Sequence, residues 1–337
     1  MEMNLKIKVA NRLIGEEEPA FIIAEAGSNH NGKLSQAKEL IDAASRGGVD
    51  AVKFQLFKAE FLYAPQHPAF SIVKENEFPR DWLAELTTYA NKKGILFLAS
   101  VFDREAVDLL MKTDTPAFKI ASSDTVNLPL LRYAASKKKP IFLSTAMCNL
   151  ADIYEAIEVI RNEGNEQIVL MQCSALYPTE PSQVHLRAMD ALKGAFRRPV
   201  GFSDHSLGIL LPPVAVARGA CAIEKHFTLS RKMKGPDHSY AIEPDELKLM
   251  AQNIRTVEQS LGSLEKVMLP EEKKLARRES LFARQDIGQN KEITAEMIEV
   301  KRPATGVEAR FFLAFVGRKA KRAIKKGDPL LWQDAEA

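Results

Sequence analysis

The stretch "FIIAEAGSNHNG" (residues 21–32) decides between two ways of alternating strands with helices. Its first six residues are apolar or small except for Glu25, as expected of a buried strand. An open, doubly wound sheet predicts a glycine-rich dinucleotide-binding loop directly after such a first strand. Because "GSNHNG" does not supply that loop, the sequence favours a closed barrel.

Strand-like runs recur along the next two hundred residues. Between most of them lie helix-like stretches such as "SQAKELIDAASRGG", with apolar residues three or four apart and glycine at the end. Together with the first strand they predict an α/β fold, a (β/α)8 TIM barrel. The runs are "AVKFQLF" (51–57), "ILFLASV" (95–101), "AFKIASS" (117–123), "PIFLSTA" (140–146), "IVLMQCS" (168–174), "PVGFSDH" (199–205) and "CAIEKHF" (221–227).

The pattern changes after the charged stretch "SLGSLEKVMLPEEKKLARRES". Beyond it, short strand-like segments are separated by turns that contain glycine. We therefore predict a barrel domain over residues 1–265, a linker over 266–278 and a small β-rich C-terminal domain over 279–337.

Composition excludes several classes of protein. The chain is 46% hydrophobic and 27% charged with a net charge of +3, as in ordinary globular proteins, and its basic tail lacks the interleaved aromatic residues of nucleic-acid binders. Neither a signal peptide nor a membrane-spanning run is apparent, which predicts a cytoplasmic protein. Cys148, Cys173 and Cys221 lie far apart and indicate reduced thiols rather than a disulfide or zinc framework.

Polar residues concentrate where the predicted strands end. Catalytic groups of such barrels lie at the C-terminal ends of the strands. Taken singly, each side chain could equally pair with a neighbour or bond to loop backbone. Two lysines converging on one mouth need an anionic partner, which a phosphate or carboxylate would supply. The residues are Glu25, Lys53, Gln55, Lys119, Ser122, Asp124, Ser144, Tyr177, Ser203, His205 and His226.

Two histidines end the last two strands. His205 and His226 lie on neighbouring strands about 4.8 Å apart, so both can reach one ion. Two neutral imidazoles, with the other positions left to water or substrate, suit Mn²⁺, Fe²⁺, Co²⁺ or Zn²⁺. No third protein ligand is evident. His238, in the following loop, is better explained by a structural or peripheral role.

An ordered set of motifs resembles the sialic acid synthase family over almost the whole chain. The barrel motifs are "FIIAEAGSNHNG", "DAVKFQ", "FKIASSD", "LSTAM", "YPT", "GFSDHS", "EKHFT" and "GPDHSYAIEPDE". "VKRPATG" and "GRKAKRAIKKGDPL" resemble that family's C-terminal antifreeze-like (SAF) domain. The resemblance implies a C–C bond-forming transferase that condenses phosphoenolpyruvate with an N-acetylated aminosugar and water. The first choice is an N-acetylneuraminate synthase using N-acetylmannosamine and releasing phosphate.

The same resemblance implies a role for each matching residue. Lys53, Lys119, Ser122, Ser144 and Ser203 would hold the phosphate and carboxylate of phosphoenolpyruvate. The aminosugar would be faced by four residues, namely Gln55, Asp124, Tyr177 and Asp237. Glu25 would lie close to the reacting centre as a base or water-positioning group, and Lys53, Lys119 and His226 would join it as catalytic residues.

The resemblance also implies a metal and a partner subunit. His205 and His226 would bind a divalent cation, Mn²⁺ in the first place, with Mg²⁺ or Co²⁺ as alternatives. The family forms a domain-swapped homodimer in which the SAF domain covers the partner barrel. Arg302 of "KRPATG" would then reach into the neighbouring subunit's site. No nucleic acid and no membrane is implied.

Three departures from the family pattern bear on the sugar. Asp124 stands where many sialic acid synthases have Glu, Ala175 where many have Asn, and Ala146 where Gly is common. Legionaminic acid, pseudaminic acid and spore-coat polysaccharide synthases, which would use a 2,4-diacetamido sugar, share most of the motifs. A 3-deoxy-octulosonate phosphate synthase is a further alternative, opposed by the SAF-like tail. An inactive carbohydrate-binding homologue is an alternative from another class.

Overall fold

The computed structural model describes residues 6–275 and 277–336. They divide into two compact units, the first ending at Gly262 and the second beginning at Ser263. The predicted domains also include residues 1–5, 276 and 337, which lie outside the described residues. Each unit has its own hydrophobic core.

A closed parallel barrel forms the first unit. Within the described ranges its eight strands follow the order β10-β3-β4-β5-β6-β7-β8-β9, and β10 pairs with β3 to close the ring. Each strand-like run of the sequence overlaps one of them, so the predicted TIM barrel is confirmed. The strands are β3 Phe21–Gly27, β4 Ala51–Gln55, β5 Leu96–Ser100, β6 Phe118–Ile120, β7 Ile141–Ser144, β8 Ile168–Gln172, β9 Val200–Asp204 and β10 Ala222–His226.

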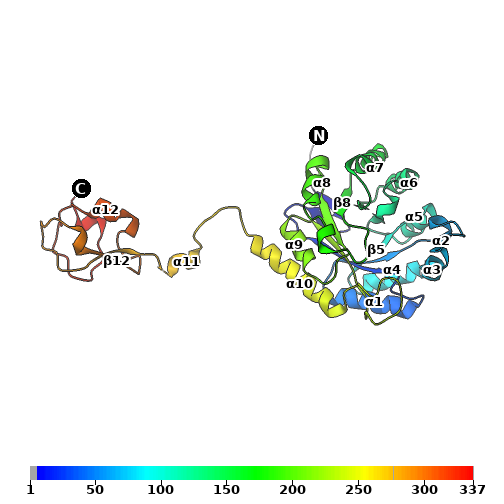
Figure 1. Cartoon of the computed structure of the whole chain (residues 1–337), viewed down its shortest axis with the longest axis horizontal. Coiled ribbons are helices and arrows are strands. Elements are labelled where there is room, and N and C mark those ends of the chain that lie inside the picture. Colours follow the sequence, from blue (N-terminus) through cyan, green and yellow to red (C-terminus); the bar gives the residue numbers. More distant parts are fainter. Residues whose placement is uncertain (1–5, 276, 337) are drawn as a thin grey trace. The chain divides into compact units, whose positions relative to one another are not determined.

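Helices follow the strands and surround the barrel (Figure 1). Local chemistry marks where some of them begin: Asp103 accepts a hydrogen bond from Ala106 N at the start of α5, and Asn149 forms a capping box with Asp152 at the start of α7. The helices of this unit are α1 Leu34–Arg46, α2 Ala59–Leu62, α3 Phe70–Glu75, α4 Leu83–Lys92, α5 Arg104–Met111, α6 Leu128–Ser136, α7 Leu150–Asn162, α8 Ala188–Phe196, α9 Leu211–Ala217 and α10 Pro244–Leu261.

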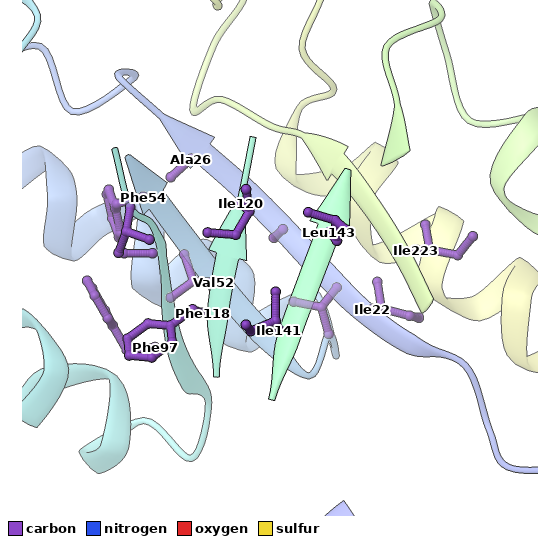
Figure 2. Packing of buried hydrophobic residues seen from close by; sticks show 14 of the residues in the cluster. Ile22, Ala26, Val52, Phe54, Phe97, Phe118, Ile120, Ile141, Leu143 and Ile223 are labelled. Atoms are coloured by element: carbon purple, nitrogen blue, oxygen red, sulfur yellow. The ribbon is translucent and has the colours of Figure 1, made fainter. Parts of the chain in front are cut away.

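Alternation along the strands divides the core into two clusters. Ile22, Val52, Phe54 and Phe118 belong to the cluster that includes residues of the surrounding helices, and Figure 2 shows part of it. The intervening residues belong to a second cluster inside the barrel, which includes Phe21, Ile23, Leu98, Phe142 and Met171. A hairpin of β1 Lys6–Val9 and β2 Arg12–Gly15 adds Ile7, Val9 and Ile14 to this interior cluster.

The second unit is small and built on short elements. β11 Ser280–Ala283 pairs antiparallel with β12 Ile298–Lys301, and isolated bridges such as Ile287↔Ile324 extend the β character predicted for this region. Its helices are α11 Pro270–Lys274 and α12 Phe312–Phe315. Leu281, Phe315 and Leu330 belong to its separate core.

Membrane-spanning helices and disulfide bonds are both absent from the sequence-based prediction. In the described part of the chain, no helix combines the length and the apolar character needed to cross a bilayer. The three cysteines are free thiols, as predicted, with Cys173 and Cys221 buried and Cys148 partly exposed.

Candidate active site

A pocket of ≈ 240 Å³ opens at the C-terminal ends of the barrel strands. Because parallel strands end at the same rim, residues far apart in sequence meet there. The pocket collects ten of the predicted site residues: Glu25, Lys53, Gln55, Lys119, Ser122, Ser144, Tyr177, Ser203, His205 and His226. It is also lined by Ser100, Cys173, Ala175 and Glu224, among others.

Lys53 lies at the bottom of this pocket between two carboxylates. Its Nζ is 2.7 Å from Glu25 Oε2 and 3.7 Å from Glu224 Oε2, and it donates a hydrogen bond to Ser100 Oγ at 2.9 Å. Burial by itself lowers the pKa of Lys53, but Glu224 and Glu25 outweigh it and raise the pKa above its ordinary value. Lys53 is therefore a buried ammonium ion at neutral pH.

Lys119 approaches Glu224 from the other side. Its Nζ donates to Ser144 Oγ at 2.6 Å and to Glu224 Oε1 at 3.2 Å, and Ser203 Oγ also donates to Glu224 Oε1 at 3.0 Å. Burial raises the pKa of Glu224, but Lys119 and Lys53 outweigh it and hold the pKa below its ordinary value. The result is a buried array of two ammonium groups, two carboxylates and several hydroxyls.

Sequence reasoning missed Glu224 and Ser100. Glu224 precedes His226 by two residues and therefore faces the same side of β10, while Ser100 ends β5 in register with Lys119. The two-residue periodicity of strands, applied to each polar residue inside the apolar runs, could have found both.

Glu25 also contacts the outer part of the pocket. Gln55 Nε2 donates to Glu25 Oε1 at 2.6 Å, while Glu25 Oε2 faces Lys53. β4 carries both Lys53 and Gln55 on its inward face, two residues apart, as predicted. Glu25 is thus an oriented carboxylate between a cation and an amide, and can accept a proton from a group bound in the pocket.

The two histidines lie side by side with ring centroids 5.5 Å apart. His205 Nδ1–H donates to Ser174 O at 2.6 Å, which leaves the Nε2 lone pair as an acceptor or metal ligand. Burial, with a further contribution from His226, lowers the pKa of His205 to about 3. His226 has a buried Nδ1 without a hydrogen-bond partner, 3.8 Å from Asp237 Oδ2.

These two imidazoles fit a divalent cation whose remaining ligands are water or substrate. Across residues 6–275 and 277–336, no cluster of three or more His, Cys, Asp or Glu side chains is arranged to hold a metal ion. A cation at this site would therefore depend on the two imidazoles, and its binding there stays a prediction.

Asp237 does not line the pocket itself but lies beside His226, which does. It accepts hydrogen bonds from Tyr240 OH at 2.7 Å and from Ser28 N at 3.4 Å. Gly27 leaves room for it, because a Cβ added to Gly27 would lie 2.6 Å from Asp237 Oδ2. Tyr177 stacks near His205, with ring centroids 4.1 Å apart, and Tyr240 lies 5.5 Å from the Tyr177 ring.

Three other residues singled out from sequence lie elsewhere. Asp124 is buried and accepts a hydrogen bond from Ser123 Oγ at 2.8 Å, and it does not line the pocket; burial raises its pKa. Arg302 is an exposed residue of the second unit, and its contact with a partner barrel stays a prediction. His238 has hydrogen-bond partners at both ring nitrogens, Thr228 Oγ1 at 2.6 Å and Asn31 Oδ1 at 3.1 Å, which agrees with a structural role.

Comparison with known proteins places this site in a family. Residues 40–266 match the NeuB family and residues 278–336 match the SAF domain. The chain is 39% identical to an N,N'-diacetyllegionaminic acid synthase of Legionella pneumophila, over 96% of each chain.

Two solved structures are also similar. The spore coat polysaccharide biosynthesis protein SpsE of Bacillus subtilis has a TM-score of 0.71 and 39% identity over 98% of this chain and 99% of its own. An N-acetylneuraminic acid (sialic acid) synthetase of Leptospira borgpetersenii, solved with citrate, has a TM-score of 0.76 and 34% identity over 80% of this chain and 94% of its own.

The fold and the pocket define a barrel enzyme whose site is lined by lysine, glutamate and histidine side chains. The chain belongs to the NeuB family of nonulosonate synthases and carries the SAF domain at its C-terminal end. The predicted family resemblance is confirmed.

Proposed function

We propose that this protein condenses phosphoenolpyruvate with an N-acetylated aminosugar and water, giving a nine-carbon 2-keto-3-deoxy acid and phosphate. The observation that carries the proposal is the meeting of two buried lysines and two histidines in one barrel-mouth pocket. Membership of the NeuB family supports it.

The lysines and hydroxyls account for binding of phosphoenolpyruvate. Lys53, Lys119, Ser144 and Ser203 lie within one hydrogen-bonded array, and Ser122 lies beside them with its Oγ accepting from Ala146 N at 3.0 Å. Ammonium and hydroxyl donors suit the phosphate and carboxylate of the substrate. As the C–O bond to phosphate breaks, the same donors stabilise the negative charge that develops on the leaving group.

His205 and His226 would hold the divalent cation, for which Mn²⁺ is our first choice. When bound, it would polarise the aldehyde of the open-chain sugar as a Lewis acid, so that C3 of phosphoenolpyruvate can attack. The Ser174 carbonyl keeps the His205 ring in one tautomer and therefore directs Nε2 as the ligand atom.

Glu25 is the candidate base for the water step. After C–C bond formation, C2 becomes electron-deficient and captures water, whose proton must leave before the phosphate departs. Glu25 can take this proton, because Gln55 and Lys53 fix its two oxygens at the same pocket. Phe102 and Ala121 also line this pocket.

The acceptor sugar has two candidates. N-acetylmannosamine follows from the family resemblance, and the 34% identity to the Leptospira synthetase supports it. A 2,4-diacetamido sugar is supported by the higher identity, 39%, to the Legionella legionaminic acid synthase. Gln55, Tyr177 and Asp237 are the residues that we expect to contact either sugar.

The deciding experiment incubates the purified chain with Mn²⁺, phosphoenolpyruvate and a panel of 2-acetamido and 2,4-diacetamido hexoses. We expect phosphate release together with a product whose mass equals sugar plus a pyruvate unit. If no sugar of the panel leads to phosphate release, the synthase proposal is removed and an inactive carbohydrate-binding homologue is favoured. Release with a diacetamido sugar alone would assign legionaminic or pseudaminic acid.

The metal ligands are tested separately. His205→Ala and His226→Ala should each abolish metal-dependent turnover without unfolding the protein, as checked by circular dichroism. Near-normal turnover in either variant would remove that histidine from the ligand set.

The proposed trans contact of Arg302 is tested by complementation. Arg302→Ala chains and His226→Ala chains should each be inactive, and mixing them should restore part of the activity once subunits exchange. Demonstrated mixed dimers without activity would assign the complete site to one chain.

A further inference from the structure

A buried ion pair lies directly behind the two histidines. Asp204 and Lys225 are partners in the register of β9 with β10, and their side chains are 0% and 1% exposed with Lys225 Nζ 2.7 Å from Asp204 Oδ2. His205 follows Asp204, and His226 follows Lys225. Since side chains alternate along a strand, the ion pair faces away from the pocket that the histidines line.

The ion pair also holds the residue that follows His205. Lys225 Nζ donates to Ser206 O. Asp204 Oδ1 accepts from Ser206 N at 2.9 Å and from Ser206 Oγ at 2.7 Å. The residues before and after His205 are thus joined in one hydrogen-bonded cluster, consisting of Asp204, Ser206 and Lys225.

His205 itself is held from the pocket side. Its ring Nδ1 donates to Ser174 O, and its backbone oxygen accepts from Thr179 N at 2.9 Å. With both neighbours bonded to the cluster behind, the direction of the His205 ring is determined by contacts on both faces of the barrel wall.

Packing alone does not explain the ion pair. Removing two charges from water costs several kcal/mol per ion, so a buried pair is often no more stabilising than apolar residues of similar volume. Apolar residues could fill the same space, but they could not bond to the Ser206 carbonyl and amide. The distinctive contribution of the cluster is therefore the position of the chain at His205.

We propose that Asp204 and Lys225 are positioning residues for the His205–His226 pair. They lock the ends of β9 and β10 in register so that the two imidazoles converge on one cation. The inference rests on the proposed function in one respect, that these histidines bind the metal. Residues that orient metal ligands from behind typically contribute about 10- to 100-fold in metal affinity.

The test compares Lys225→Met with the double variant Asp204→Asn/Lys225→Met. Binding of Mn²⁺ alone is measured by electron paramagnetic resonance, and the free energy of unfolding by urea denaturation. Lys225→Met leaves a buried carboxylate without its cation and should lose both stability and about 10- to 100-fold in Mn²⁺ affinity. The double variant should recover stability but not affinity, because nothing donates to Ser206 O.

Arg80→Met is the matched control. Arg80 forms another largely buried ion pair of the same barrel, with Asp103, away from the histidines. The Arg80→Met variant should be less stable than the parent protein but should keep its Mn²⁺ affinity. If the double variant instead recovers affinity together with stability, or if Arg80→Met loses affinity equally, the cluster is only structural and the inference is overturned.

A metal-free measurement separates this inference from the proposed function. Nitrogen NMR of the histidine rings should show one tautomer of His205 in the parent protein and a mixture in Lys225→Met and in the double variant. One tautomer in all three would overturn the positioning role. If His226→Ala leaves the Mn²⁺ affinity unchanged, the histidines are not the metal site of the proposed function. The tautomer of His205 would still decide whether Asp204 and Lys225 position its ring.

Discussion

The interior of the barrel has two layers built on the same strands with opposite chemistry. The N-terminal layer is represented by the apolar residues Phe21, Ile23, Leu98, Phe142 and Met171. The C-terminal layer begins two residues further along each strand, so that Glu25 lies two residues after Ile23 and Ser100 two residues after Leu98. It consists of Glu25, Lys53, Ser100, Lys119 and Glu224.

The difference separates stability from function. Burying apolar side chains stabilises the fold by roughly 25 cal/mol per Å² removed from water, whereas burying charges stabilises little or not at all. The N-terminal layer therefore supports the barrel, and the C-terminal layer is retained for what it binds. Each layer should respond to substitution in its own way.

The largest effect is expected in the C-terminal layer from Lys119→Met combined with Glu224→Gln. This double variant removes one charge of each sign, so its free energy of unfolding should change by less than about 1 kcal/mol. Phosphate release should fall by about 10²- to 10³-fold, since an anion-stabilising donor is lost. Steady-state kinetics and urea denaturation measure the two quantities.

Lys119→Met alone is the control for that double variant. It leaves Glu224 with only part of its compensation and should be less stable by about 3 kcal/mol. If the double variant retained activity within tenfold of the parent, the C-terminal layer would not be the functional one.

In the N-terminal layer, Phe142→Ala should lower the free energy of unfolding by about 3–5 kcal/mol. The ring of Phe142 stacks on Phe21 with centroids 5.8 Å apart, so its removal leaves a cavity in the interior. Activity per folded molecule should persist, because Phe142 does not line the pocket. Phe142→Leu should cost less, about 1.5 kcal/mol. Activity lost without loss of stability would break the separation between the layers.

A smaller effect is expected at His30, a buried polar residue that belongs to neither layer. Its ring packs against Phe78 and Trp82, and burial lowers its pKa to about 4. Because the unfolded chain takes up the proton near pH 6.5, stability should fall as pH drops below 6.5, with the full loss reached below pH 4. Between pH 7 and pH 5 the loss should be about 2 kcal/mol.

His30→Phe provides the comparison for this pH dependence. Urea denaturation of the variant at pH 7 and pH 5 should lack the His30 contribution, so its stability should fall less than that of the parent. An equal fall in both proteins would show that His30 does not carry the pH dependence.

Much of the barrel site could be predicted because strand patterns are local. Lys53 and Gln55 share a face through two-residue alternation, and the rim rule then brings them to Lys119 and His226. Glu224 is hard to find from sequence because it lies inside the strand run, two residues before the end of β10, rather than at the strand end. The β1–β2 hairpin was overlooked because its strands, Lys6–Val9 and Arg12–Gly15, are too short for a clear pattern.

Other assignments depended on long-range contacts. His226 and His238 both belong to one histidine-containing stretch, yet only His226 lines the pocket, while His238 is bonded to Thr228 and Asn31. Asp124 lies two residues after Ser122, so strand alternation predicts that both face the pocket. The 3₁₀ turn Ser122–Asp124 instead places Asp124 outside the pocket lining. The spacing of residues along the sequence does not predict that His238 and Asp124 lie outside the pocket lining.

The sequence by itself determined the barrel, the β-rich C-terminal domain and the rim at which the chemistry lies, because hydrophobic periodicity and strand polarity are properties of short segments. Only the tertiary structure decided how the charges are paired: Glu224 between Lys53 and Lys119, and Asp204 with Lys225 behind the histidines. These pairings join residues up to 171 positions apart, as between Lys53 and Glu224, and the closure of the ring brings them within hydrogen-bonding or ion-pair distance.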